Sequence, residues 1–373
     1  MPNKKIPYGR QSISRADISE VVKVLKSDWL TQGPKVSEFE KALASYVGVK
    51  YAVAVTNGTA ALHLAYLAAG LSKGDEVIVT PNTFASVVNM LVILGVKPVF
   101  CDIRLDTYNL DESKIEALIT KRTKAIAPLH FAGQAAEMDK IKKIAGKNKL
   151  TVIEDACHGL GGKYRGRKIG SLADMGILSF HPVKPITTGE GGAILTDNYE
   201  YYKKLVRLRS HGITKDKQGK NVMTELGYNY RLTDIQAALG LSQLARLDKF
   251  AKKRRQVAKW YQEELKDFQE IILPLELPGN RSAWHLYVIR VKKSTDRDKL
   301  MAHLIKHGVG ANFHYPAVYA HPYYRQRGFR NFKLKNEDLY RQSCLTLPCQ
   351  TKLTKAEIIY IKKVIKKYYE KLY

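Results

Sequence analysis

The chain has 373 residues, 45% of them hydrophobic, so it can bury sizeable cores and form two or three domains. It carries 62 lysines and arginines against 35 aspartates and glutamates, a formal net charge of +27. This excess is unusual, and a positive surface of this kind would draw in anionic molecules.

The cysteine content and the hydropathy of the sequence indicate the cellular compartment. Four cysteines without close-pair spacing are too few for a disulfide framework, so we expect a reducing compartment and no metal. No apolar run reaches the length of about eighteen residues that a membrane helix needs. The N-terminus is too short and polar for a signal peptide, so we expect a cytoplasmic protein with no membrane partner.

The N-terminal half alternates between helical and strand-like patterns. Amphipathic helices are expected over residues 12–27 and 37–47, the second opened by a capping box of Ser37 and Glu40. Short apolar runs follow, at Val53 and at residues 77–79, 99, 125–129, 152–153, 177–178 and 193–195. With helical segments between several of them, these runs predict a mostly parallel, buried sheet of the α/β class.

A possible anion site follows the first of these runs. Residues 51–55 (Tyr-Ala-Val-Ala-Val) end in the turn 56–59 (Thr-Asn-Gly-Thr), and a helical pattern begins at Ala60. Such an order points helix-terminal N–H groups at an anion. Gly58 permits close backbone approach and Thr59 adds a hydroxyl. Alone, the pattern fits any strand-to-helix turn.

Two further side chains follow later strands. Phe84 comes just after strand 77–79, where an aromatic ring can stack on a flat ligand or simply join the core. Asp155 directly follows strand 151–154, and ligands of parallel sheets collect at the carboxyl ends of strands. Its carboxylate could pair with the ring nitrogen of a cofactor, and it could equally cap the next helix. His130, after strand 125–129, is either a pocket residue or a core histidine.

Lys184 lies in a turn flanked by Pro182 and Pro185 and followed by Thr-Thr-Gly-Glu-Gly-Gly at positions 187–192. The prolines fix the local backbone, so the amine is held in one direction, unlike a solvated helix-face lysine. A lysine held at the edge of a buried site can form a Schiff base with the aldehyde of pyridoxal phosphate (PLP). No nucleophile elbow with a Ser/His/Asp set competes with this interpretation.

Taken together, the anion site at residues 56–59, Phe84, Asp155 and Lys184 would surround one cofactor from four sides. At this point the chain resembles the DegT/DnrJ family of PLP-dependent nucleotide-sugar aminotransferases. The resemblance extends nearly end to end, through residues 30–34, 57–62, 179–192, 227–232 and 312–316. It implies the PLP-dependent transferase fold type I, a mostly parallel sheet sandwiched by helices. Members with histidine in place of the lysine are dehydratases, so Lys184 favours transamination.

The resemblance also implies residue roles. Lys184 would form the internal aldimine and serve as the base, and Asp155 would pair with the pyridinium nitrogen. The other implied cofactor contacts are Gly58, Thr59, Phe84, His158, Ser179 and Asn229, the last reaching the neighbouring subunit's site of a homodimer. The implied sugar-nucleotide contacts are Tyr8, Asp28, Trp29, Leu30, Thr31, Gly58, Ser179, Asn229, Asn312, Phe313, His314 and Tyr315.

Within the family, residues 180–192 are most similar to the C4 aminotransferases of pseudaminic acid biosynthesis. This similarity implies ping-pong transfer of an amino group from L-glutamate to C4 of a UDP-linked 4-keto-6-deoxy-N-acetylhexosamine. An aminotransferase for a different 4-keto nucleotide sugar is the alternative.

The C-terminal third predicts a second domain. A helical pattern from Leu232 to about Leu265 leads out of a large PLP-binding domain of residues 1–249. A smaller α/β domain, 250–373, would contain strand 285–291, helix 296–307 and a helix from Lys355.

Basic runs at residues 252–255 and 362–367 raise nucleic-acid binding as a remote alternative, in a non-catalytic or regulatory protein. Both runs lie on helical patterns. In the second, Ile358, Ile361 and Ile365 mark a core face that leaves the lysines solvated. We therefore expect no nucleic-acid partner.

Overall fold

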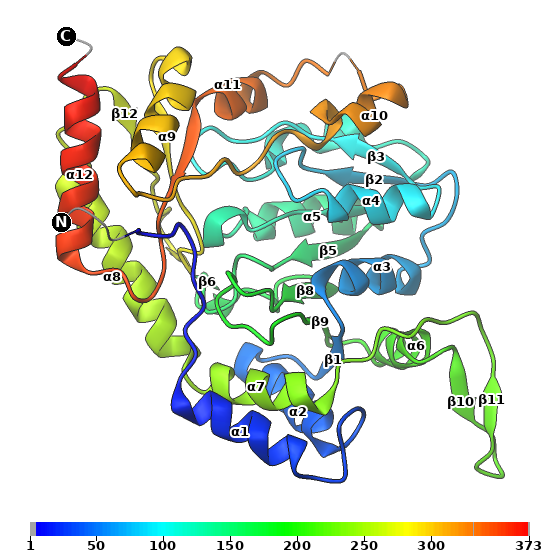
Figure 1. Cartoon of the computed structure of the whole chain (residues 1–373). Coiled ribbons are helices and arrows are strands. Elements are labelled where there is room, and N and C mark those ends of the chain that lie inside the picture. Colours follow the sequence, from blue (N-terminus) through cyan, green and yellow to red (C-terminus); the bar gives the residue numbers. More distant parts are fainter. Residues whose placement is uncertain (1–4, 331, 372–373) are drawn as a thin grey trace.

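A seven-stranded sheet forms the centre of the computed structural model, which describes residues 5–330 and 332–371 (Figure 1). Its strands, in spatial order, are β1 (Tyr51–Val55), β9 (Gly192–Thr196), β8 (Met175–Ser179), β5 (Thr151–Asp155), β4 (Thr123–Ala127), β2 (Glu76–Val79) and β3 (Lys97–Phe100). All neighbours pair in parallel except at β9, which runs against both β1 and β8. The predicted mostly parallel sheet is thus confirmed.

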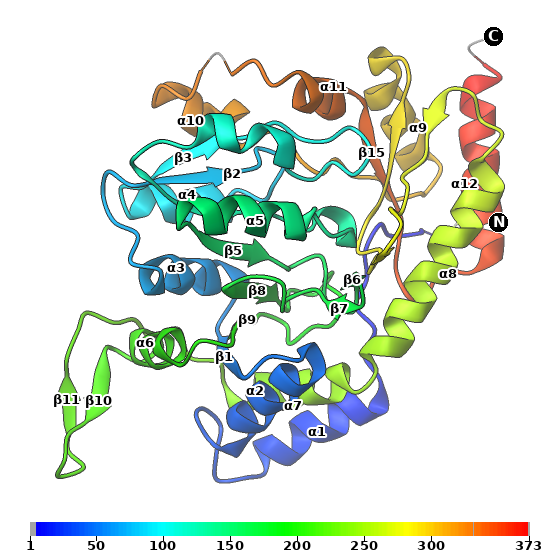
Figure 2. The ribbon, with the colours of Figure 1, turned by 180° about the vertical axis from the view of Figure 1, so that it is seen from behind.

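Helices cover both faces of this sheet, which explains why its strands are continuous apolar runs. One core cluster lies between the sheet and α2 (Pro34–Val47), α5 (Met138–Asn148) and α7 (Asp234–Leu244). The other lies against α3 (Gly58–Ala68), α4 (Ser86–Ile93) and α6 (Tyr199–Arg209). Figure 2, seen from behind, shows α5 on the face opposite to α3. Helix α1 (Arg15–Leu25) packs on α7.

A smaller sheet, β12 (Ile271–Ile272), β14 (Tyr287–Val291) and β15 (Cys344–Leu347), lies beside the main one. It shares a core with α8 (Leu247–Leu265), α9 (Arg297–Lys306) and α12 (Lys355–Tyr369). Ile6, far away in sequence, belongs to this core, whereas Val318 and Tyr319 pack on the main sheet. The division of the chain near residue 250 stays a prediction.

The remaining elements are short. Strands β6 (Lys163–Tyr164), β7 (Arg167–Lys168) and β13 (Asn280–Arg281) form a third sheet, and helices α10 (Pro322–Gln326) and α11 (Lys335–Ser343) precede β15. Strands β10 (Ile213–Lys215) and β11 (Asn221–Met223) form a hairpin that projects from the body of the chain (Figure 1). In the described part of the chain, no helix is both long and apolar enough to cross a membrane.

Three expected helix boundaries were wrong. The first helix begins at Arg15 instead of residue 12, with Ser14 as its cap. The pattern from Leu232 to Leu265 is two helices, because the chain turns between α7 and α8, where the Arg246 guanidinium binds the Asp17 carboxylate.

The second helix begins at Pro34, three residues before Ser37. Proline suits the first helical position, and the carboxylate of Asp234, distant in sequence, supplies the cap. Glu40 forms no capping box; instead it accepts hydrogen bonds from the Ala54 amide (2.8 Å) and Arg209 (2.5 Å) and ties α2 to β1 and α6.

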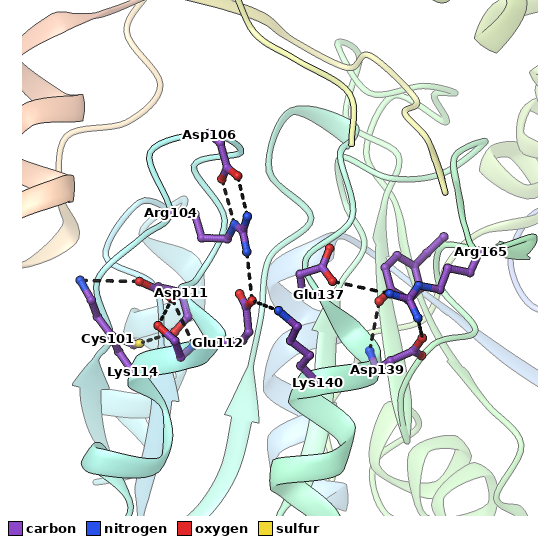
Figure 3. A network of polar contacts seen from close by, with 12 residues as sticks. Cys101, Arg104, Asp106, Asp111, Glu112, Lys114, Glu137, Asp139, Lys140 and Arg165 are labelled. Carbon is purple, nitrogen blue, oxygen red and sulfur yellow. Dashed lines mark hydrogen bonds and ion pairs between the residues drawn. The ribbon is translucent and has the colours of Figure 1, made fainter. Parts of the chain in front are cut away.

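Ion pairs hold the segment that follows β3 against α5 (Figure 3). Arg104 binds Asp106 (2.8 Å) and the buried Glu112 (3.0 Å), and Lys140 of α5 reaches the same Glu112 oxygen at 2.9 Å. Lys114 likewise binds the buried Asp102 at 2.8 Å. Because buried carboxylates depend on these cations for compensation of their charge, the network fixes the segment in place.

The buried carboxylate of Asp234 caps α2. It accepts hydrogen bonds from the backbone N–H groups of Gly33 (3.0 Å), Lys35 (3.2 Å) and Val36 (3.2 Å). We expect Asp234→Ala to lower the free energy of unfolding by about 1–3 kcal/mol, since three N–H groups lose their acceptor. Urea denaturation measures this loss. The exposed Asp298→Ala is the control, and equal losses in both variants would contradict the capping role.

Candidate active site

A cavity of about 500 Å³ opens where β1, β2, β5 and β8 end. Parallel strands collect ligands at this edge because their carboxyl ends converge there. Ten of the predicted site residues line the cavity: Tyr8, Gly58, Thr59, Phe84, Asp155, His158, Ser179, Lys184, His314 and Tyr315. The structure therefore assembles in one place side chains that are separated by up to 307 positions in the sequence.

Lys184 enters the cavity from a turn that closes on Phe180. The Phe180 carbonyl accepts hydrogen bonds from the Thr188 amide (3.0 Å) and the Thr187 hydroxyl (2.9 Å), and the Lys184 amide binds the His181 carbonyl (2.9 Å). Burial lowers the pKa of the Lys184 amine, because a protonated amine loses solvation there. A larger neutral fraction makes this lysine a better nucleophile and base.

The start of α3 forms an anion cradle. Asn57 caps the helix by accepting a hydrogen bond from the Ala60 amide (2.8 Å), which leaves earlier N–H groups of the first turn for a ligand. A Cβ on Gly58 would lie 2.9 Å from the Ser179 Cβ, so only glycine lets the two segments approach this closely. Thr59 and Ser179 add hydroxyl groups. These residues fit a phosphate group.

Asp155 and Phe84 fit an aromatic cationic ring. Asp155, 6% exposed, accepts a hydrogen bond from the Cys157 amide at 3.0 Å and lines the cavity. Phe84 is 61% exposed, an unusual state for a large aromatic side chain, and its ring meets Tyr315 edge-on at 6.4 Å. It is therefore not a core residue, and its free face can cover a flat ligand.

Three buried histidines line the same cavity as Lys184. Burial, together with the charge of Lys184, lowers the pKa of His158 and His285 well below the usual value and that of His314 to about 4. All three imidazoles are neutral near pH 7. Sequence reasoning placed His285 in a strand and missed its place in the lining, because His285 precedes β14 of the smaller sheet instead of following a strand of the main sheet.

The cavity also contains residues that sequence reasoning did not assign to the site. These are Asn57, Leu62, Thr83, Ser86, Leu129, Cys157, His181, Val183, Glu190, His285 and Leu286. Several of them directly neighbour a predicted residue, so extending each motif by one or two positions would have found them.

Other predicted residues lie elsewhere. Residues 28–31 and Asn229 are exposed and do not line this cavity. Asn312 pairs with Thr346, and Arg297 lies over the Phe313 ring at 4.5 Å. His130 is a core residue: its Nε2 lies 2.6 Å from the Glu154 carboxylate, with both side chains fully buried.

Comparison with known proteins agrees with this geometry. The model of the DegT/DnrJ/EryC1/StrS aminotransferase family matches residues 11–366. The chain belongs to this family. It is a PLP-dependent sugar aminotransferase with the predicted α/β fold type I architecture.

Individual relatives match over almost their whole length. The UDP-4-amino-4,6-dideoxy-N-acetyl-beta-L-altrosamine transaminase of Campylobacter jejuni (strain 81-176) is 39% identical over 98% of both chains. Helicobacter pylori PseC, an aminotransferase involved in the biosynthesis of pseudoaminic acid, superposes with a TM-score of 0.95 at 34% identity, covering 99% of this chain and 100% of that one. The PLP form of Streptococcus pneumoniae Spr1654 gives 0.94 at 30% identity, covering 99% and 100%.

The neutral histidines predict that the protein loses stability in acid. Because the pKa of His314 falls from 6.5 to about 4 on folding, its contribution is complete above pH 6.5 and is lost as the pH falls from 6.5 to 4. The full loss is about 3 kcal/mol. Thermal denaturation of the cofactor-free protein across this range should show a shallower decline in His314→Gln. The exposed His211→Asn is the control; an unchanged decline in His314→Gln would contradict the prediction.

Proposed function

We propose that this enzyme transfers an amino group from L-glutamate to C4 of a UDP-linked 4-keto-6-deoxy-N-acetylhexosamine. The product would be UDP-4-amino-4,6-dideoxy-N-acetyl-β-L-altrosamine, an intermediate of pseudaminic acid biosynthesis. The main support is Lys184, a lysine of lowered pKa between an anion cradle and a strand-end carboxylate. The relatives named above support the choice of sugar.

The roles of the chain's own residues follow from the geometry. PLP, when bound, supplies an electron-withdrawing ring that accepts an amino group and passes it on. Lys184 Nζ would hold the cofactor's aldehyde carbon and, once released, carry a proton between substrate carbon and cofactor. The Asp155 carboxylate would keep the ring nitrogen protonated, and Gly58, Thr59 and Ser179 would hold the phosphate. Because donor and acceptor use one site in turn, we expect ping-pong kinetics.

We propose that the enzyme works as a homodimer. Large apolar side chains are exposed along α1 and the loop after it: Ile18 (57%), Val22 (39%), Leu25 (55%), Trp29 (57%) and Leu30 (47%). Several large apolar side chains exposed on one short stretch of chain are more often found at interfaces than on the surface of a monomer. A second copy covering the patch would also explain why residues 28–31 and Asn229, expected at the site, lie outside their own chain's cavity.

A cytoplasmic location is part of the proposal. It is supported by Cys101, Cys157, Cys344 and Cys349, which are all buried and unpaired, as expected in a reducing compartment.

The sugar can be tested directly. Purified enzyme with PLP and L-glutamate is incubated with a panel of 4-keto nucleotide sugars, and the amino sugars are identified by mass. We expect turnover of the UDP-linked 4-keto-6-deoxy-N-acetylhexosamine, and loss of at least about 10³-fold with Lys184→Ala, which removes nucleophile and base together. The exposed Lys217→Ala is the matched control. Preferred turnover of another sugar would overturn the substrate assignment.

Mixing experiments test the shared site. Lys184→Ala and Asn229→Ala should each be inactive or impaired alone, but their mixture should regain activity, because one of the two sites in a mixed dimer carries neither change. Subunits are exchanged in mild denaturant before the assay. If Asn229 served its own chain's site, mixing would restore nothing beyond the sum of the two separate variants.

A further inference from the structure

Glu154 and His130 form a buried couple next to Asp155. His130 Nε2 lies 2.6 Å from one Glu154 oxygen, and the Leu172 backbone N–H donates to the other oxygen at 2.7 Å. Both side chains of the couple are fully buried. Neither of them lines the cavity, so neither is placed to touch a ligand bound there.

The positions of the protons in this couple follow from its partners. The Ala136 backbone N–H donates to His130 Nδ1 at 3.1 Å, and a backbone amide can only donate, so Nδ1 carries no proton. The single proton of the ring therefore lies on Nε2 and is donated to the Glu154 carboxylate. Both oxygens of that carboxylate accept hydrogen bonds, and the couple as a whole carries one negative charge.

His130 holds β5 at two successive residues. Its backbone N–H donates to the Asp155 carbonyl at 3.1 Å, while its side chain binds Glu154. The Asp155 backbone N–H in turn donates to the Pro128 carbonyl at 2.8 Å. Main-chain and side-chain contacts together therefore fix the end of β5 to the segment that follows β4.

The Asp155 carboxylate depends on this anchoring. Successive side chains of a strand point to opposite faces, so Glu154 enters the core while Asp155 faces the cavity. One Asp155 oxygen accepts the Cys157 backbone N–H at 3.0 Å, a contact within the same turn that moves together with the backbone. The direction in which the carboxylate meets a ligand is thus set by the strand end that carries it.

We propose that Glu154 and His130 are positioning residues, which fix the end of β5 so that the Asp155 carboxylate meets the ring nitrogen of PLP in one orientation. The inference rests on the proposed role of Asp155 and is independent of the sugar. A buried carboxylate costs free energy, and apolar side chains of the same volume often stabilise a core equally well. The contribution of the couple is therefore the direction of Asp155 rather than added stability.

The ring nitrogen itself provides the readout. The protein is loaded with PLP that is isotopically labelled at this nitrogen, whose NMR chemical shift reports protonation and hydrogen bonding. Glu154→Gln removes the charge and turns an N–H group toward either His130 or Leu172, which are both donors. We expect the shift to move toward that of an unprotonated ring, and the Kd of PLP to rise about tenfold, the usual effect of one buried hydrogen bond.

Two substitutions of His130 separate its two side-chain contacts. His130→Gln places an amide nitrogen near the position of Nε2, so it can still donate to Glu154. His130→Asn is too short for that contact and places its oxygen near the position of Nδ1, where it can accept from Ala136. We expect His130→Gln to keep a nitrogen shift and a Kd of PLP close to those of the parent, and His130→Asn to behave like Glu154→Gln.

Tyr261→Phe is the matched control, since it removes a buried hydrogen bond to the Pro348 carbonyl (2.9 Å) in the core of the smaller sheet. It should lower the melting temperature and leave the nitrogen shift and the Kd of PLP unchanged. The same pattern in Glu154→Gln would show that the couple serves stability alone and would overturn the proposal. Equal values for the two His130 variants would overturn it as well.

Asp155→Asn separates this inference from the proposed function. An unchanged nitrogen shift in Asp155→Asn would overturn the role of Asp155 and the inference with it. A changed shift there, with parent values in Glu154→Gln, would overturn the inference alone. Should Glu154→Gln not fold, the two His130 variants carry the test, because they differ in whether Glu154 keeps its donor.

Discussion

The convergence of strand ends at one edge of the main sheet is the constraint on which the site depends. Strand β1 leads to the cradle at Gly58, β2 to Phe84, β5 to Asp155 and β8 to the turn of Lys184. None of these segments could form the cavity alone, because each contributes one side of it. Strand β9 runs in the opposite direction, so its first residue, Gly192, lies at the same edge. A Cβ on Gly192 would lie 2.5 Å from the Asn57 carbonyl oxygen. Close backbone packing at the edge thus brings the cradle and the lysine turn together.

The cavity favours uncharged groups, although the chain as a whole is strongly positive. The chain carries a net charge of +27, yet burial favours the neutral forms of Lys184 and of the histidines around it. Burial disfavours the protonated form of each of these groups. Each group that does carry a charge makes protonation of its neighbours still less favourable. The surface charge can draw anionic substrates toward the protein, but chemistry at Lys184 needs an amine without its proton. Both effects are compatible because water screens the outer charges from the inner ones.

Much of the fold and the cofactor site could be predicted from the sequence, since both depend on local patterns. Buried strands are continuous apolar runs, and the residues that follow them lie at the ligand edge by topology alone. Prediction failed where a distant residue decides a local structure: Asp234 caps α2 across 201 positions from Gly33, so Ser37 looked like the better start. It also failed for His285, which enters the cavity from the neighbourhood of the smaller sheet. Asp28 and Asn229 were expected at the site but lie outside the cavity of their own chain, which no local pattern in the sequence indicates.

Recognition of the cofactor and recognition of the substrate differ in how far they depend on local sequence patterns. The groups proposed to hold PLP all come from one chain: a helix terminus, a buried carboxylate and a lysine turn. A sugar is recognised by the geometry of its hydroxyl groups. Tyr315 lines the cavity with its hydroxyl 3.0 Å from His158 Nε2 and its ring packed against Phe131 and His314. A fixed donor rewards an oxygen in one place and penalises its absence, which discriminates between sugars more sharply than a flexible side chain does. Related enzymes that share the cofactor site can therefore differ in substrate through small changes around such a donor.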